Sequence, residues 1–270
     1  SAGWMWISSK LLYMKKFLRV ILCVTLALAL TLSSCANAKV RQYRLQVVKE
    51  YPHDRASYTQ GLFFFGGQMY ESTGLNGKST FRKVDITTGK PLFRLNFDRR
   101  YFLEGSVEKG GNIYMLTWQN QVAFVYDAKT LNYKSTFSYP REGWGLTTDG
   151  KSLIASDGTS NLFFLDDNFK TVKTLPVRMD GRPVHFLNEL EFIDGKVWAN
   201  VYMSDLIVII DPANGAVTGV VDCTGLLPDK LKYSDTDVLN GIAYNPVDGK
   251  IYLTGKNWCR LYEVKLVEVR

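Results

Sequence analysis

Histidine and cysteine are scarce in this chain of 270 residues, which contains two histidines and four cysteines. The cysteines show no CxxC spacing, and with only His53 and His185 available the sequence predicts no zinc cluster. A GxSxG nucleophile elbow, an HExxH pair and a glycine-rich phosphate loop are also absent. These absences argue against serine-hydrolase, zincin and nucleotide chemistry.

A strong excess of one charge is missing from most of the chain as well. The formal net charge is +7, but residues 1–34 hold four basic residues and no acidic one, so the remainder carries +3. That is an ordinary surface, and we expect no nucleic-acid partner. With 46% hydrophobic and 22% charged residues, the chain is neither disordered nor a polytopic membrane protein.

The first residues are typical of an export signal. Met14 precedes a basic segment, residues 15–19, and the apolar run Val20–Leu32, which is followed by Ser-Ser and Cys35. This ending resembles a bacterial lipobox, so we expect cleavage before Cys35, lipidation of its thiol and a periplasm-facing lipoprotein of the cell envelope. A transmembrane anchor is the alternative, but thirteen apolar residues are too few to span a bilayer.

These segments divide the chain into three parts. Residues 1–35 are upstream residues and signal peptide, residues 36–42 are a short linker, and residues 43–270 are the catalytic domain. After export and lipidation only Cys223 and Cys259 remain available as cysteines. In an oxidising compartment they either pair or stay as buried cysteines, and the sequence leaves both possibilities open.

The fold is predicted to be all-β, because short aromatic-rich runs alternate with turn dipeptides from about residue 44 and no helical periodicity is sustained. The turns tolerate positive φ and recur every 39 to 54 residues. They are Gly66-Gly67, Gly110-Gly111, Asp149-Gly150, Asp194-Gly195 and Asp248-Gly249.

Five units of about 45 residues match the blade period of a β-propeller, so we predict a five-bladed β-propeller. The last unit has only three strands and ends at Leu266, whereas Tyr43–Val48 is an unassigned strand. We therefore expect this N-terminal strand to close the last blade and remove a free edge. A β-sandwich would not explain the constant offset of about five residues between each inner strand's start and its turn.

In such a propeller the inner strands begin at one rim, and the second strands return to it. The residues predicted to meet there are Gln60, Glu71, Glu104, Trp118, Trp144, Asp157, Asn188, Glu189, Asn200, Tyr202, Asn240, Lys256 and Trp258. Several of the amides could serve only to satisfy backbone groups. Glu104 stands out, because its apolar neighbours Phe102 and Leu103 favour a raised carboxyl pKa.

The motifs around these positions carry a resemblance to a known family. They include Tyr58-Thr59-Gln60-Gly61-Leu62, Leu103-Glu104-Gly105, Thr117-Trp118, Gly143-Trp144-Gly145-Leu146, Leu187-Asn188-Glu189-Leu190-Glu191, Val238-Leu239-Asn240-Gly241 and Thr254-Gly255-Lys256. Together they resemble the plant and bacterial type of glutaminyl-peptide cyclotransferase from about residue 45 to 265. That family consists of five-bladed propellers that convert the N-terminal glutamine of peptides and proteins to pyroglutamate and release ammonia.

The resemblance also implies roles for individual residues. Glu104 would be the acid/base carboxylate and Lys256 a second catalytic group, with the substrate held by Gln60, Trp118, Trp144, Asn188 and Tyr202. Plant members have a tryptophan where this chain has Tyr202. No cofactor is required for cyclisation; plant members can hold structural metal ions, whose ligands cannot be assigned here.

Two other classes remain as alternatives. One is a propeller of the cell envelope that binds peptides without chemistry, which the presence of Glu104 argues against. The other is a metal-dependent propeller lactonase or hydrolase, whose calcium would need oxygen ligands from residues such as Glu71, Asn188, Glu189 and Asn240.

Overall fold

The computed structural model describes residues 39–269, which form twenty-two β-strands and a single short 3₁₀ turn, Asp229–Leu231. This all-β architecture confirms the predicted fold class. Within the described residues no helix is long and apolar enough to cross a bilayer. Residues 1–35 with Cys35, and the first three residues of the expected linker 36–42, lie outside the described part.

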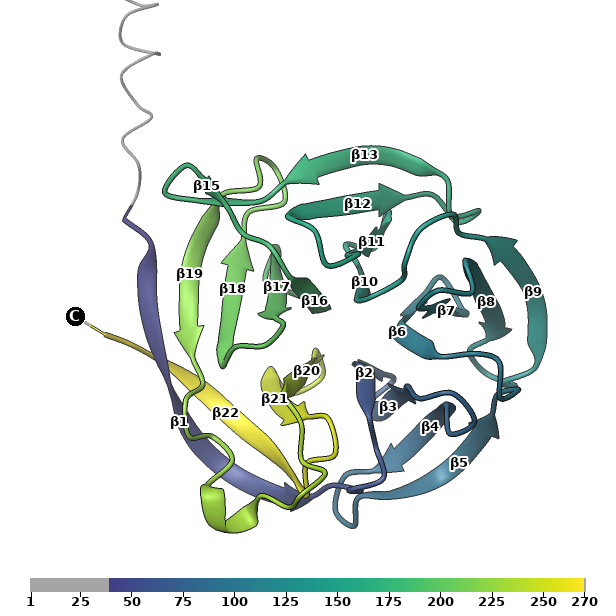
Figure 1. Cartoon of the computed structure of the whole chain (residues 1–270), viewed down its shortest axis with the longest axis horizontal. Coiled ribbons are helices and arrows are strands. Elements are labelled where there is room, and N and C mark those ends of the chain that lie inside the picture. Colours follow the sequence, from purple (N-terminus) through teal and green to yellow (C-terminus); the bar gives the residue numbers. More distant parts are fainter. Residues whose placement is uncertain (1–38, 270) are drawn as a thin grey trace, which may run out of the picture. The chain divides into compact units, whose positions relative to one another are not determined.

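Three consecutive four-stranded antiparallel sheets make up the first part of the unit Val40–Arg270. Their strands follow the sequence order from the centre outward (Figure 1). The first sheet is β2 (Thr59–Phe65), β3 (Gln68–Thr73), β4 (Thr80–Asp85) and β5 (Lys90–Asn96); the second is β6 (Leu103–Lys109), β7 (Asn112–Thr117), β8 (Val122–Asp127) and β9 (Tyr133–Ser138); the third is β10 (Leu146–Thr148), β11 (Leu153–Ala155), β12 (Asn161–Leu165) and β13 (Thr171–Pro176).

The remaining long strands form one eight-stranded sheet in the order β16-β17-β18-β19-β1-β22-β21-β20. Its members are β1 (Arg41–Pro52), β16 (Leu187–Ile193), β17 (Lys196–Val201), β18 (Leu206–Ile210), β19 (Val217–Asp222), β20 (Leu239–Asn245), β21 (Lys250–Gly255) and β22 (Arg260–Glu268). A small hairpin of β14 (Arg178–Met179) and β15 (Arg182–Pro183), not expected from the sequence, precedes β16.

The N-terminal strand β1 pairs antiparallel with the last strand β22, from Tyr43 opposite Glu268 to Pro52 opposite Arg260. The expected pairing of the two chain ends is thus present, and the strand starts at Arg41, two residues before the predicted boundary. β1 also pairs in parallel with β19, where Arg41 lies opposite Gly219. This second pairing was not predicted, and it makes β16–β19 and β20–β22 parts of one continuous sheet.

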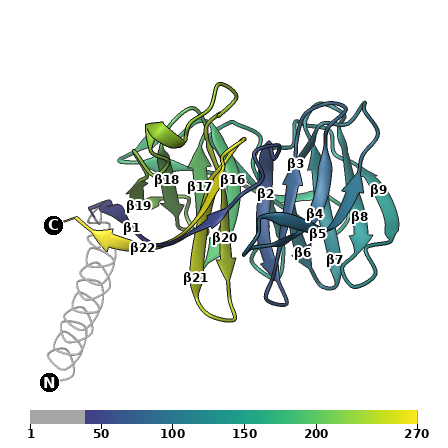
Figure 2. The same cartoon turned by 90° about the horizontal axis from the view of Figure 1, so that it is seen from below.

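Five strands lie innermost: β2, β6, β10, β16 and β20 (Figure 1). Each contacts the next along the chain, and β20 contacts β2, so they close a circle. Figure 2 shows β2, β16 and β20 running along the axis of that circle. They approach so closely that a Cβ on Gly105 would collide with the backbone of Leu146, and one on Gly61 would come within 2.6 Å of Ser106 N. Glycine is required at these crossings because only it leaves room for the neighbouring strand.

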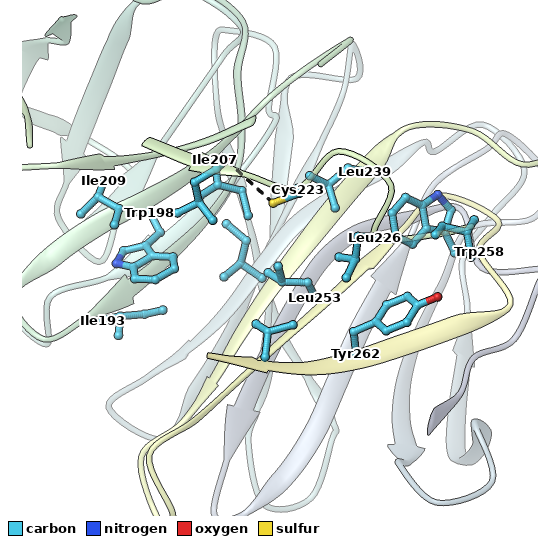
Figure 3. Packing of buried hydrophobic residues seen from close by; sticks show 14 of the residues in the cluster. Ile193, Trp198, Ile207, Ile209, Cys223, Leu226, Leu239, Leu253, Trp258 and Tyr262 are labelled. Atoms are coloured by element: carbon cyan, nitrogen blue, oxygen red, sulfur yellow. Dashed lines mark hydrogen bonds between the residues drawn. The ribbon is translucent and has the colours of Figure 1, made fainter. Parts of the chain in front are cut away.

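Hydrophobic clusters fill the spaces between adjacent sheets. Figure 3 shows the one that contains Trp198, Cys223, Leu253 and Tyr262, all less than 7% exposed. Cys223 and Cys259 belong to this cluster, and both are free thiols. Of the two possibilities left open by the sequence, the structure therefore has buried, unpaired cysteines.

Candidate active site

One end of the circle of inner strands holds a pocket of about 230 Å³. All seven residues that the sequence assigned to catalysis or substrate binding line it, together with two aromatic residues that it did not assign. The lining residues are Tyr58, Gln60, Phe102, Glu104, Trp118, Trp144, Asn188, Tyr202 and Lys256.

Local breaks in strand register position the polar side chains. The pairing of β6 with β7 shifts between Leu103 and Ser106, so Glu104 lies in a bulge. Comparable shifts occur in β2 at Gln60, in β16 at Asn188 and in β20 at Asn240. A bulge inserts an unpaired residue and redirects its side chain, which is why four inner strands each present a polar group at this end.

Glu104 is the buried carboxyl group of the pocket, with 5% of its surface exposed. Gln60 Nε2 donates a hydrogen bond to Glu104 Oε1 over 3.2 Å. Burial raises the pKa of Glu104 well above its ordinary value; the charge of Lys256 opposes this shift and that of Glu142 adds to it. A carboxyl with a raised pKa can both accept and return a proton near neutral pH.

The side chain of Gln60 is held in a fixed orientation. Its Oε1 accepts a hydrogen bond from Asn240 Nδ2 over 3.3 Å, which leaves Nε2 to donate toward Glu104. Asn240 Nδ2 also donates to Thr59 O over 2.9 Å. Asn240 does not line the pocket, so it supports the site from behind.

Lys256 lies between two aromatic rings and is 4% exposed. Its Nζ is 4.8 Å from the ring centre of Tyr58 and 5.0 Å from that of Tyr202, within the range of cation–π attraction. Burial lowers the pKa of Lys256, whereas the charges of Glu104 and Asp237 act in the opposite direction. Tyr58 is fixed in turn because its hydroxyl donates to Asp237 Oδ2 over 2.8 Å.

The walls of the pocket are aromatic. Phe102 packs edge to face against Trp118, with ring centres 5.4 Å apart, and Trp144 does the same against Tyr202 at 5.5 Å. The indole nitrogens of Trp118 and Trp144 both donate to Glu142 Oε2, over 2.9 and 3.2 Å. Tyr202 thus takes part in a wall at the position where plant relatives were expected to carry tryptophan.

Two carboxylates that were expected at this rim do not line the pocket and bond to other groups of the protein instead. Glu71 Oε1 is 2.9 Å from His53 Nε2, and its Oε2 is 3.2 Å from an Arg82 nitrogen. Burial acts to raise the pKa of Glu71, but the charges of Arg82 and His53 prevail and lower it to about 2. Glu189 accepts backbone N–H groups of Leu62 and Ile242 over 3.2 and 2.8 Å.

Other expected rim residues also have structural contacts. Trp258 Nε1 donates to Asp237 O over 2.8 Å, and Asn200 Oδ1 accepts from Gly241 N over 3.0 Å. Asp157 caps a turn by accepting from Thr159 N over 3.1 Å. In residues 39–269 no three His, Cys, Asp or Glu side chains form a group suited to a metal ion.

Three residues of the site were not assigned from the sequence. Tyr58 and Phe102 each stand two positions before a predicted residue, Gln60 and Glu104, and this spacing places side chains on the same face of an extended segment. That alternation could have identified both. Glu142 contacts the indoles through the shape of the loop 140–145, which no periodicity in the sequence predicts.

The pocket therefore combines a buried carboxyl group with a raised pKa, a buried lysine and side-chain amides within aromatic walls. Such a site suits a small substrate that has a polar reacting group and an aliphatic stem.

Comparisons with known proteins identify the family. A family model described as glutamine cyclotransferase matches residues 20–266. A glutaminyl-peptide cyclotransferase of Arabidopsis thaliana is 42% identical over 227 residues, covering 82% of this chain and 71% of the plant protein. The crystal structure of Myxococcus xanthus glutaminyl cyclase superposes with a TM-score of 0.80 at 34% identity, covering 86% of this chain and 100% of that chain. The resemblance inferred from the motifs is confirmed, and the chain belongs to the glutamine cyclotransferase family.

Proposed function

We propose that this protein is a glutaminyl-peptide cyclotransferase, which converts the N-terminal glutamine of peptides and proteins to pyroglutamate and releases ammonia. The family membership and the likeness to glutaminyl cyclase support this activity. Within the site, the observation that carries the proposal is Glu104, a buried carboxyl group that faces a pocket of suitable size beside amide and ammonium donors.

Cyclisation requires that the α-amine of the substrate attack its own side-chain carboxamide carbon. A C–N bond forms in the five-membered ring, the bond to the carboxamide nitrogen breaks, and that nitrogen leaves as ammonia. Nucleophile and electrophile belong to one molecule, so the enzyme needs no external nucleophile and, we expect, no cofactor. Its main tasks are to hold a folded conformer of the glutamine and to move protons.

Glu104 is the group that moves the proton in this scheme. As the carboxylate it accepts a proton from the attacking amine, and as the acid it delivers the proton to the departing nitrogen. Burial raises its pKa well above the ordinary value, which favours its action as an acid as well as a base. The hydrogen bond from Gln60 Nε2 fixes the carboxylate while it does so.

The oxyanion that develops on the carboxamide oxygen needs donors, and Lys256 and Asn188 supply them. Lys256 carries its charge into a buried site, where electrostatic stabilisation is strongest. Among the described residues the Asn188 amide has no side-chain hydrogen bond, so its N–H groups are available to the substrate. Trp118 and Trp144 hold the aliphatic stem, and the peptide continues into solvent from the open rim.

The fold that carries this site is a five-bladed propeller. Five innermost strands in a closed circle support this count, with the eight-stranded sheet regarded as two blades that β1 joins. In this description β1 completes the last blade as its fourth strand, and its parallel contact with β19 ties that blade to the preceding one.

Delivery to the cell envelope as a lipoprotein completes the proposal. The basic segment, the apolar run and the Leu-Ser-Ser-Cys ending at Cys35 support export and lipidation. The strands begin at Arg41, so a short segment separates the lipid from the catalytic unit. Substrates are then peptides and proteins of the envelope with an exposed N-terminal glutamine.

Ammonia release from a glutamine-initiated peptide tests the activity. The purified protein is incubated with this peptide, or with a matched peptide that begins with alanine, with and without a chelator. We expect ammonia and a blocked N-terminus only from the glutamine peptide, at a rate that the chelator does not change. Release of no ammonia would favour the peptide-binding alternative, and loss of activity with chelator would favour a metal-dependent enzyme.

A further inference from the structure

Glu142 connects the two tryptophan walls of the pocket through a single oxygen atom. Its Oε2 accepts the indole N–H of Trp118 over 2.9 Å and that of Trp144 over 3.2 Å, while its Oε1 accepts from Gln119 Nε2 over 3.3 Å. The residue lies in loop 140–145, between β9 and β10, and does not itself line the pocket.

The two indoles come from different sheets. Trp118 follows β7, and Trp144 precedes β10, so no shared strand fixes the distance between them. An indole has only one N–H donor, and both donors are directed at Oε2. Hydrogen bonds to an ionised acceptor are shorter and stronger than neutral ones, which makes this carboxylate a firm link between the walls.

Glu142 is also ionised near neutral pH. Partial burial acts to raise its pKa, but the hydrogen bonds from Trp144, Trp118 and Gln119 outweigh burial and hold the pKa of Glu142 below its ordinary value. The site thus contains a fixed negative charge that the substrate does not have to contact.

Glu142 bonds to two tryptophans that line the same pocket as Glu104, so its charge lies beside that pocket. The charged groups that affect Glu104 are Lys256, which lies at the end of β21 and lowers its pKa, and Glu142, which raises it. Tyr58 is the titratable group on the side of β2, and burial keeps it neutral by raising the pKa of its hydroxyl. Glu142 is therefore the negative side chain that partly offsets the effect of Lys256.

We propose that Glu142 is a positioning residue of the cyclisation reaction, which sets the spacing between Trp118 and Trp144 and places a fixed negative charge near the proton-transferring Glu104. This inference rests on the proposed function. It assigns two separable effects to one side chain: a geometric effect on the walls that hold the glutamine, and an electrostatic effect on proton transfer.

Substitutions at position 142 separate the two effects. Glu142→Ala removes both hydrogen-bond acceptors, so the walls lose their link, and we expect KM for a glutamine-initiated peptide to rise about tenfold, with a smaller change in kcat. Glu142→Gln keeps an oxygen that accepts from the indoles but removes the charge. We expect its KM to stay within about threefold of wild type, since the geometry is retained.

The pH dependence of kcat/KM tests the effect of the Glu142 charge. Because a like charge raises a carboxyl pKa, its removal lowers the pKa of Glu104, and the acidic limb of kcat/KM against pH moves to lower pH in Glu142→Gln. Glu108→Gln is the matched control. Glu108 lies on β6, the strand that also holds Glu104, but at its opposite end, where its Oε1 accepts a hydrogen bond from Gly111 N. We expect the acidic limb of this control to coincide with that of wild type.

Each of the two proposed effects of Glu142 can be contradicted by one result. An unchanged KM in Glu142→Ala, or an acidic limb that stays in place in Glu142→Gln, would overturn the corresponding half of the proposal. Thermal unfolding identifies a variant that merely folds poorly, and Glu142→Gln then still tests the charge. Wild-type ammonia release tests the proposed function alone, whereas the ratios between variants test the role of Glu142.

Discussion

At the scale of single residues, the proposed chemistry depends on the carboxyl group of Glu104. Glu104→Gln keeps the size of the side chain and its contact with Gln60 but cannot accept and return a proton. We expect kcat to fall by about 10² to 10⁴, with an unchanged melting temperature. Steady-state ammonia release and thermal unfolding measure the two quantities.

Trp144→Ala serves as a contrast, because it removes a wall of the pocket and should act substantially through KM. If Glu104→Gln keeps full kcat, another residue must transfer the proton.

Two asparagines at equivalent strand positions should behave differently. Asn188 lines the pocket and its amide is available to the substrate, whereas Asn240 Nδ2 is engaged with Thr59 O and Gln60 Oε1. We expect Asn188→Ala to lower kcat by about 10² to 10³ with little loss of stability. Asn240→Ala should cost about 1–3 kcal/mol of unfolding free energy, because buried partners lose their donor. Kinetics and denaturant unfolding of both variants check this; equal effects on stability would contradict the distinction.

We expect Glu191 to make the stability of the protein depend on pH. Glu191 is buried, and burial raises its pKa from 4.5 to about 8, although the backbone N–H of Tyr244 donates to Glu191 Oε1 over 2.9 Å. A raised folded-state pKa means that the associated stability is fully present below the unfolded pKa of 4.5 and is lost as pH rises toward 8. Glu191→Gln stays neutral, so its melting temperature relative to wild type should increase between about pH 5 and about pH 9. A constant difference in melting temperature across this range would refute the assignment.

At the scale of elements, β1 is the strand on which closure depends. Truncation before Arg41 leaves all pairs of β1 with β22 and β19 intact, whereas removal of residues up to Val48 exposes the edges of both strands. We expect the longer truncation to lower the melting temperature by roughly 10 °C or more, since each kcal/mol corresponds to about 2–4 °C at this size. Scanning calorimetry compares the two forms, and equal melting temperatures would exclude this role for β1.

The elements also show what the sequence can and cannot predict. The Gly66-Gly67 and Gly110-Gly111 turns have positive φ at both residues, so their glycines marked the hairpins reliably. Glu104 and Gln60 could be placed at one rim because strand order fixes where inner strands begin. The contacts of Glu142 and the parallel pair of Arg41 with Gly219 could not be predicted, since a loop conformation and a long-range pairing leave no period in the sequence.

At the scale of the whole molecule, the proposed position of the protein in the cell depends on Cys35. Cys35→Ala removes the thiol that would receive the lipid, so we expect the precursor to remain uncleaved and unlipidated. Incorporation of radiolabelled fatty acid, followed by fractionation of membranes, measures both effects, with Cys223→Ala as the control because that thiol is buried. Absence of label from the wild-type protein would exclude lipoprotein processing.

The pairing of β1 with β22 also has a consequence for the order in which the chain can fold. Strands β2 to β13 pair only with near neighbours along the sequence, so their three sheets can form while synthesis or translocation continues. The eight-stranded sheet cannot be completed at that stage, since its centre joins residues near 43 to residues near 268. β1 can pair with β19 along one edge before that stage, but its other edge stays unpaired until β22 has been made. Lys256, which lines the pocket, lies between β21 and β22, so the pocket is also completed only late in synthesis.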